Sequence, residues 1–109
     1  MKNKEVRKEL QMLYGLRCLL TNEKTRLSVH HIEKVEYGGN TNELNCVLLN
    51  RDIHDWLHNE LEQNDRKMFE LVNDCLDLYK KCIKLGLTDL VEEYENEIIP
   101  KTKERIKRK

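Results

Sequence analysis

The chain lacks several features that would place a small protein in a class at once. It has no excess of either charge, because 20 basic and 20 acidic residues give a net charge of zero, and aromatic residues make up only 6%. No apolar run reaches the length of a membrane span, and none follows the N-terminal lysines, so we expect neither a membrane helix nor a signal peptide. The four cysteines lack the spacing of a disulfide framework, which favours reduced thiols.

The distribution of charge is more informative than its sum, which on its own argues against a nucleic-acid binder. Residues 1–58 carry nine basic and eight acidic groups, residues 59–100 carry five and eleven, and residues 101–109 carry six and one. Only the first and last parts are therefore candidates for a surface that faces DNA. The basic tail includes Lys101, Lys103 and Arg105. It is either a solubilising terminus or an arm that neutralises backbone phosphates without reading sequence.

Length and composition predict one domain over residues 1–109. Apolar residues make up 39% of the chain and charged residues 37%, which suits a helix-rich protein in water. The segment from Lys2 to Leu13 has the spacing of an amphipathic helix and should end before Gly15. Its apolar stripe is Val6, Leu10 and Leu13.

A β-hairpin followed by a helix is predicted in the middle of the chain. Residues 26–32 alternate and become β-branched, which is typical of a short strand, and Gly38-Gly39 marks a turn. Residues 45–49 form a second apolar run that could return antiparallel to the first. From Asn50 the period becomes helical. One side of this helix carries Ile53, Trp56, Leu57 and Leu61.

All four histidines lie in this region, as the pair His30-His31 and as His54 and His58. On a helix, His54 and His58 share one face, so they can bind one ion together with a histidine from the strand. Neighbouring residues of a strand point to opposite sides, so His30 and His31 should have different roles. One would join the metal, and the other would accept a proton from water, since an imidazole with a pKa of about 6.5 is largely neutral at neutral pH.

These residues resemble the motif of the HNH endonucleases, which belong to the ββα-metal (His-Me finger) superfamily. The order His-His, Asn45, His54, His58 is similar to that of the colicin-type DNases, and the resemblance covers roughly residues 14–59. It implies a ββα-metal nuclease core within a mostly helical α+β protein. Many family members also carry two CxxC pairs that bind zinc. Here Cys18 with Thr21 replaces the first pair, so we expect packing to hold the core instead.

The resemblance implies a role for each residue of the site. His31 would be the general base, and His30, His54 and His58 would be the metal ligands. Asn45 would hold the loop between the strands and help to orient His31. The implied reaction is hydrolysis of a DNA phosphodiester to 5′-phosphate and 3′-hydroxyl ends, and RNA is a substrate that the chemistry also allows.

One divalent metal ion is the expected cofactor. Imidazole ligands favour a transition ion such as Zn²⁺, Ni²⁺ or Mn²⁺ over Mg²⁺, which prefers oxygen. Members of the resembled family often use Mg²⁺, so both groups of ions stay open.

Lys34 and Arg51 are candidate phosphate contacts near the histidines. Lys34 either reaches a phosphate or is a solvated lysine. Arg51 opens the predicted helix, where it either contacts a phosphate oxygen or pairs with Asp52 or Asp55.

An antiparallel helical hairpin is predicted over residues 64–100. Asn64 or Asp65 is suited to begin the first helix and Gly86 to end it. Thr88 is predicted to cap the second helix and Pro100 to interrupt it. The second helix carries Leu90, Val91, Tyr94 and Ile98. The acidic helices of residues 65–98 should pack on the nuclease core or on a partner, either a second subunit or another protein.

Two alternatives come from other classes of protein. One is a catalytically silent nucleic-acid-binding domain with the ββα shape, and the other is a structural zinc module for protein interaction. The presence of both His30 and His31 argues against a purely structural site, which needs ligands but no spare base. Small free-standing HNH proteins similar to this chain occur in phages, mobile elements and bacterial systems, which implies the cytoplasm of a bacterium or a phage-infected host.

Overall fold

The computed structural model describes residues 3–107, so the predictions for Lys2 and for the last two residues of the basic tail lie outside the described part. The first helix, α1 (Asn3–Tyr14), has close to the predicted bounds and buries Val6, Leu10 and Tyr14. The prediction that Leu13 is buried is wrong, because this side chain is 42% exposed. The helix is turned so that Tyr14, at the far edge of the stripe, faces the core instead.

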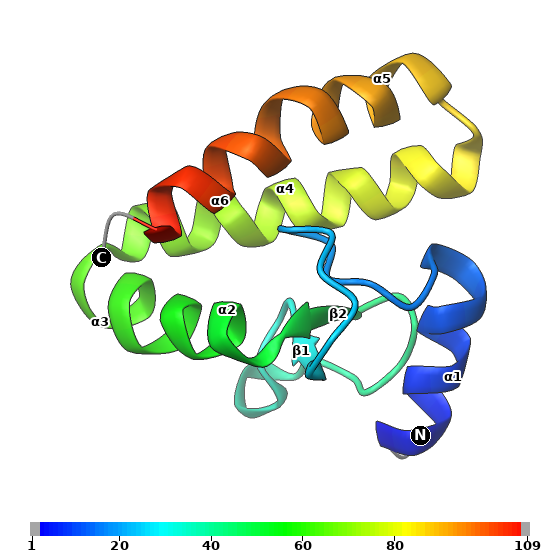
Figure 1. Ribbon diagram of the computed structural model, residues 1–109. Helices are drawn as coiled ribbons and strands as arrows, with labels where there is room; N and C mark the ends of the chain where they lie inside the picture. Colours follow the sequence, from blue (N-terminus) through cyan, green and yellow to red (C-terminus); the bar gives the residue numbers. More distant parts are fainter. Residues whose placement is uncertain (1–2, 108–109) are drawn as a thin grey trace.

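The predicted hairpin is formed by β1 (Leu27–His31) and β2 (Cys46–Asn50), which pair antiparallel. The register places Leu27 opposite Asn50 and His31 opposite Cys46. Every residue of β2 is buried, whereas β1 is buried only in part. Figure 1 shows this small sheet between α1 on one side and the helix that follows β2 on the other, with the C-terminal helices above it.

One helical path follows β2 without a break in the chain direction. It consists of α2 (Arg51–Trp56), the π-helical turn η2 (Leu57–Leu61) and the short α3 (Glu62–Asn64). The four apolar residues predicted for one side of this helix are all buried. The sheet and this helix therefore enclose a core that reaches from Leu10 in α1 to Leu57.

The predicted hairpin of long helices is also present. The first helix, α4 (Arg66–Leu85), begins at Asp65, whose side chain accepts a hydrogen bond from the backbone of Met68, and ends at Gly86 in the left-handed conformation. The second comprises α5 (Thr88–Glu93), the π-helical turn η3 (Tyr94–Ile98) and α6 (Ile99–Lys107), which run back along α4 (Figure 1). The prediction that Thr88 caps this helix is wrong, because Thr88 is the first helical residue and follows Leu87 at the cap position.

Pro100 does not interrupt the second helix, and the π-helical turn before it explains why. The backbone N–H of Ile99 bonds the carbonyl of Tyr94, five residues back, so the turn is wider there and the proline ring fits without breaking the helix. The same turn shifts the buried face by one residue. Ile99 is buried, whereas Ile98 is 37% exposed.

The described chain is mostly helical with one two-stranded antiparallel sheet, in agreement with an α+β fold. The hairpin is joined to the rest by Tyr94, which stacks on Tyr79 at 3.8 Å between ring centroids and donates a hydrogen bond to the carbonyl of Leu19. All four cysteines are free. Among the described residues, no helix has the length and apolar character needed to cross a membrane.

Lys80, a charged residue that is only 3% exposed, ties α4 to the loop before β2. Its ammonium group donates hydrogen bonds to the carbonyls of Glu43, Leu44 and Cys46, at 2.7, 3.0 and 2.8 Å. Burial lowers the pKa of Lys80 to about 8, so the group is still mainly protonated at neutral pH. These bonds therefore fix the start of β2 at one position along the axis of α4.

We expect Lys80→Met to lower the free energy of unfolding by about 2 kcal/mol, because it leaves buried carbonyls without a donor. Lys84→Met, at an exposed position of the same helix, should change it by less than about 0.5 kcal/mol. Urea unfolding of both variants measures the difference. Equal effects would show that the three hydrogen bonds do not stabilise the fold.

Candidate metal centre

Three of the four histidines lie together where β1, α2 and η2 meet. The ring centroids of His30 and His54 are 5.1 Å apart, those of His30 and His58 5.2 Å, and those of His54 and His58 4.8 Å. One potential ligand nitrogen from each ring lies within 4.8 Å of the others. We call these three residues the histidine cluster. His31 is outside it.

The alternation of β1 accounts for this division of the histidine pair. Ser28 and His30 are two residues apart and share the face of the strand that points to α2 and α4. His30 is only 1% exposed. His31 points to the opposite face and remains partly accessible. His54 and His58, one helical turn apart, complete the cluster from the following helix.

A hydrogen bond from α4 determines which nitrogen of His30 carries the proton. Nε2 of His30 lies 2.8 Å from Oδ1 of Asn73, and both side chains are buried. A carbonyl oxygen only accepts, so Nε2 is the donor and Nδ1 keeps its lone pair. Nδ1 is buried and has no hydrogen-bond partner among the described residues. This nitrogen is thus prepared to bind a cation.

Ser28 has the corresponding role for His54. Its hydroxyl donates to the backbone carbonyl of Leu49 at 3.3 Å, so it accepts from Nδ1 of His54 at 2.9 Å. Nε2 of His54 is then left with the lone pair. Ser28 therefore forms one hydrogen bond to the neighbouring strand and one to the histidine of α2.

Glu62 holds the third ring, that of His58. Nδ1 of His58 donates to Oε1 of the carboxylate at 3.0 Å, which leaves Nε2 with its lone pair. The Glu62 side chain is only 8% exposed, and its second oxygen pairs with Lys34. Burial opposes ionisation of Glu62, but hydrogen bonds from Lys34 and His58 outweigh it and hold the pKa of this carboxyl below its usual range.

The donor set therefore fits a metal ion. Each ring of the histidine cluster has one nitrogen bound to a separate protein partner, the arrangement that orients metal-binding histidines in proteins. Burial and the neighbouring histidines lower the pKa of His30 to about 3 and that of His54 to about 4; the bond to Asn73 opposes this at His30. Both rings are thus neutral at physiological pH, as ligation requires.

His31 lines the same open cavity as His54 and His58, although it is outside the cluster. The cavity holds about 490 Å³ and is also lined by Val29 and Lys34. Nε2 of His31 lies 3.0 Å from the hydroxyl of Thr41, which fixes the ring. A histidine that binds no cluster residue, yet shares the cavity with two of them, is suited to accept a proton there.

Asn45 holds the loop between the strands and makes no hydrogen bond to His31. Its side chain accepts from the backbone N–H of Glu33 and donates to the carbonyls of Glu33 and Asn40, all at 2.9 Å. Gly39 permits this closure, because a Cβ at that position would overlap the carbonyl of Glu33. Asn40, whose carbonyl Asn45 binds, is next to Thr41, whose hydroxyl contacts His31.

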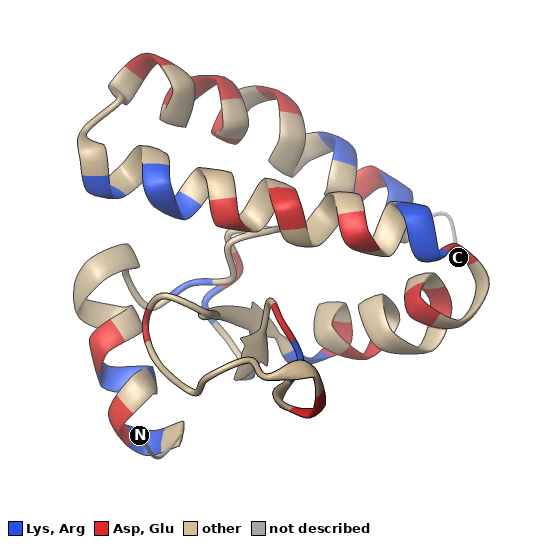
Figure 2. Cartoon of the chain, turned by 180° about the vertical axis from the view of Figure 1, so that it is seen from behind, with Lys and Arg blue, Asp and Glu red and all other residues tan. Residues whose placement is uncertain are grey.

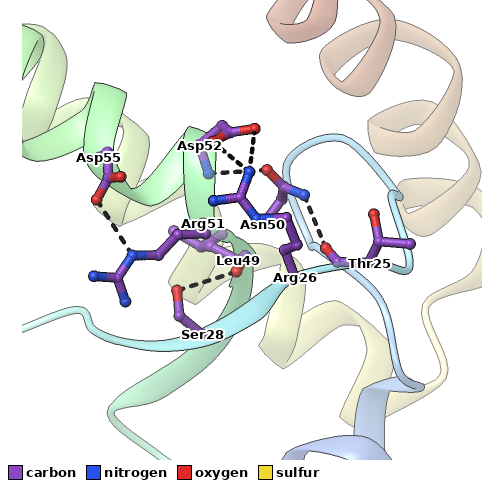
Figure 3. A network of polar contacts seen from close by, with 8 residues as sticks. All are labelled: Thr25, Arg26, Ser28, Leu49, Asn50, Arg51, Asp52 and Asp55. Carbon is purple, nitrogen blue, oxygen red and sulfur yellow. Dashed lines mark hydrogen bonds and ion pairs between the residues drawn. The ribbon is translucent and has the colours of Figure 1, made fainter.

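The start of α2 is anchored by a polar network that sets the direction of the His54 helix (Figure 3). The Asn50 side chain accepts from the backbone N–H of Asp52 at 3.0 Å and donates to the carbonyl of Thr25 at 2.8 Å. Arg26 adds an ion pair with Asp52 at 3.0 Å. These bonds join the residues that precede β1 and follow β2, so the helix leaves the sheet at a defined angle.

The candidate phosphate contacts lie in different places. Lys34 lines the histidine cavity, but its ammonium group is paired with Glu62 and Glu36. Arg51 pairs with Asp55, one of its two predicted acidic partners, at 3.6 Å, and both side chains are exposed (Figure 3). Lys101 and Arg105 line an apolar cavity between α4 and α6, and Lys103 lines another. These three residues do not line the cavity of the histidines.

Five polar residues of this region were not identified from the sequence, namely Ser28, Thr41, Glu62, Asn73 and Lys80. Three of them could have been recognised. Asn73 and Lys80 lie on the same face of α4 as Phe69 and Leu76, where a buried polar residue needs a partner. Glu62 is four residues after His58, which is compatible with a contact on a helix. Nothing in the spacing of Ser28 or Thr41 indicates their contacts.

Comparison of the chain with models of protein families, with curated proteins and with solved structures found no match in any of the three.

We expect the metal-free protein to lose stability as the pH falls from 6.5 toward 4. The folded state disfavours protonation of His30 and His54, so the unfolded chain binds more protons in this range and stability rises with pH. Each such proton contributes a slope of up to about 1.4 kcal/mol per pH unit. Urea unfolding at pH 4 to 8 measures this slope, and His54→Gln should reduce it. An unchanged slope in the variant would contradict the low pKa of His54.

Proposed function

We propose that the chain is a metal-dependent HNH-type endonuclease that hydrolyses DNA phosphodiester bonds. The observation that carries the proposal is that three histidines have their lone pairs set by separate partners, while a fourth opens onto the same cavity without joining them. On this proposal, β1, β2 and α2 form the ββα-metal core within residues 14–59, and the helical hairpin supports it through Asn73.

His30, His54 and His58 would hold one divalent ion, through Nδ1 of the first and Nε2 of the other two. When bound, the ion would supply positive charge to the scissile phosphate and to the departing 3′ oxygen. The donor set of neutral imidazoles supports a transition ion such as Zn²⁺, Ni²⁺ or Mn²⁺, and water ligands would complete the site for Mg²⁺.

His31 would take the proton of the attacking water. Its ring is held by Thr41 on one side and faces the cavity of about 490 Å³, which gives room for a phosphodiester beside the cluster. Asn45 would be a positioning residue, because it acts through the loop that carries Thr41. Lys34 balances the charge of Glu62, which in turn holds the ring of His58. The ammonium group of Lys34 would therefore support a metal ligand instead of contacting DNA.

Cleavage of supercoiled plasmid with each of Mg²⁺, Mn²⁺, Ni²⁺ and Zn²⁺ tests the activity. We expect the wild type to cut DNA in a way that chelation prevents, and His31→Ala to lose about two to four orders of magnitude in rate while it still binds the metal. Tyr37→Ala, at an exposed position of the same loop, should keep full activity. A folded, metal-binding wild type that cuts neither DNA nor RNA would contradict the proposal and favour the silent binding domain or the structural zinc module.

Metal binding can be tested separately from catalysis. We expect Asn73→Leu to weaken Zn²⁺ binding by about 10- to 100-fold, because His30 loses the acceptor that fixes its proton on Nε2. Asn73→Asp keeps an acceptor and should bind close to wild type. Calorimetric titration of Zn²⁺ into the metal-free proteins measures both. Equal affinity in the wild type and Asn73→Leu would show that α4 does not prepare the site.

A further inference from the structure

The outer face of α4 carries a row of leucines that the described fold leaves uncovered. Leu71, Leu78 and Leu85 are 53%, 60% and 73% exposed. They are spaced by seven residues, so they lie along one line of the helix. Leucines exposed in a continuous row, unlike scattered ones, indicate a surface that contacts another molecule.

Two cysteines and a methionine complete this row. Cys75 and Cys82 lie between the leucines and are partly buried, as is Met68 one turn before Leu71. The resulting spacing alternates between three and four residues, which is the pattern of a coiled-coil contact. We call this row the α4 seam, and it consists of Met68, Leu71, Cys75, Leu78, Cys82 and Leu85.

The other faces of α4 already have neighbours. Phe69, Asn73, Leu76 and Lys80 are buried against the sheet and its loops. Tyr79 stacks on Tyr94 of the second helix of the hairpin. Of the seam, Met68 and Cys75 also pack against the core of their own chain, whereas Leu71, Leu78 and Leu85 remain exposed.

The charge changes sign along α4, which begins with basic Arg66 and Lys67. Acidic Glu70, Asp74 and Asp77 are followed toward the turn by basic Lys81 and Lys84. Figure 2 shows this change of sign along the helix, with acidic residues in its middle and basic residues near the end that leads to α5. From Glu70 to Lys84, the helix is therefore complementary in charge to the same stretch of a copy that runs in the opposite direction.

We propose that the α4 seam binds the same seam of a second copy, antiparallel and about a two-fold axis. In this arrangement Met68 faces Leu85 of the second copy, Leu71 faces Cys82 and Cys75 faces Leu78. Each layer thus pairs a leucine with a smaller or more flexible side chain, so the helices can approach closely. Because the contact is isologous, each pair occurs twice.

The charged residues beside the seam favour an antiparallel pair formed by two copies of α4. In the antiparallel pair, Asp74 lies beside Lys81 of the second copy, and Lys81 can also keep its ion pair of 2.8 Å with Asp77 of its own helix. A parallel pair would instead bring Asp74 beside Tyr79 and Lys81 beside Gly86 of the second copy, so neither charge would meet an opposite charge. Self-complementarity of this kind is expected of a surface that meets its own copy.

A recess next to the seam adds to the contact. Met68, Leu71 and Cys75 also line an apolar cavity of about 190 Å³ between α4 and α6, together with Val72 and Ile98. The cavity opens beside the half of the seam that faces Leu78 and Leu85 of the second copy. A leucine side chain that enters it would bury apolar surface that is otherwise exposed to water.

Sedimentation velocity from about 1 µM to about 300 µM tests the dimer, since an interface of one helix per copy is at the small end of stable contacts. We expect the wild type to dimerise within this range. Leu78→Glu should raise the dissociation constant by at least about 100-fold, because two carboxylates replace two leucines near the axis. Leu44→Glu is the matched control, since Leu44 is 63% exposed but lies outside the seam, and it should dimerise as the wild type does.

A charge exchange tests the antiparallel direction. Asp74→Lys and Lys81→Asp should each weaken the dimer, and the double variant should restore it, because the two positions face each other across the axis. Restoration would not occur with an unrelated partner or in a parallel pair. A monomeric wild type at every concentration overturns the proposal, as does a dimer that survives Leu78→Glu. Disruption by Leu78→Glu without restoration in the double variant overturns the antiparallel arrangement.

Discussion

The need to pair the polar groups buried beneath α4 determines how the two halves of the molecule join. Asn73 and Lys80 lie on a face of α4 that is otherwise apolar, and each finds its partners outside the helix. One bonds the histidine of β1, and the other bonds the carbonyls that lead into β2. Because an unpaired buried polar group is costly, these contacts fix the height and rotation of α4 against the sheet.

The same contacts prepare the histidine cluster. A ring nitrogen becomes a ligand only when its proton is held elsewhere, and here three different elements supply the acceptors: Ser28 from β1, Glu62 from α3 and Asn73 from α4. Burial then keeps His30 and His54 neutral. Keeping these rings neutral lowers the stability of the fold below pH 6.5. A bound cation would compensate the buried nitrogen of His30 that has no hydrogen-bond partner among the described residues.

Much of the local structure could be predicted from residue patterns. Both strands, the helix with His54 and His58, and the caps at Asp65 and Gly86 follow from periodicity and from residues with strong positional preferences. The errors concern Leu13, Thr88 and Pro100. The error at Pro100 arises at the π-helical turn of Tyr94–Ile98, where a wider turn admits the proline, an effect that a period of 3.6 cannot anticipate.

The sequence by itself determined the elements and the spacing of the histidines, because helix and strand periods are local properties of the chain. It also separated His30 from His31, since adjacent strand residues point to opposite faces. Only the tertiary structure decided which ring nitrogen of each histidine keeps a lone pair that can bind a metal ion. The partners of His30 and His54 lie 43 and 26 residues away along the chain, and such contacts depend on how the elements pack rather than on any local pattern.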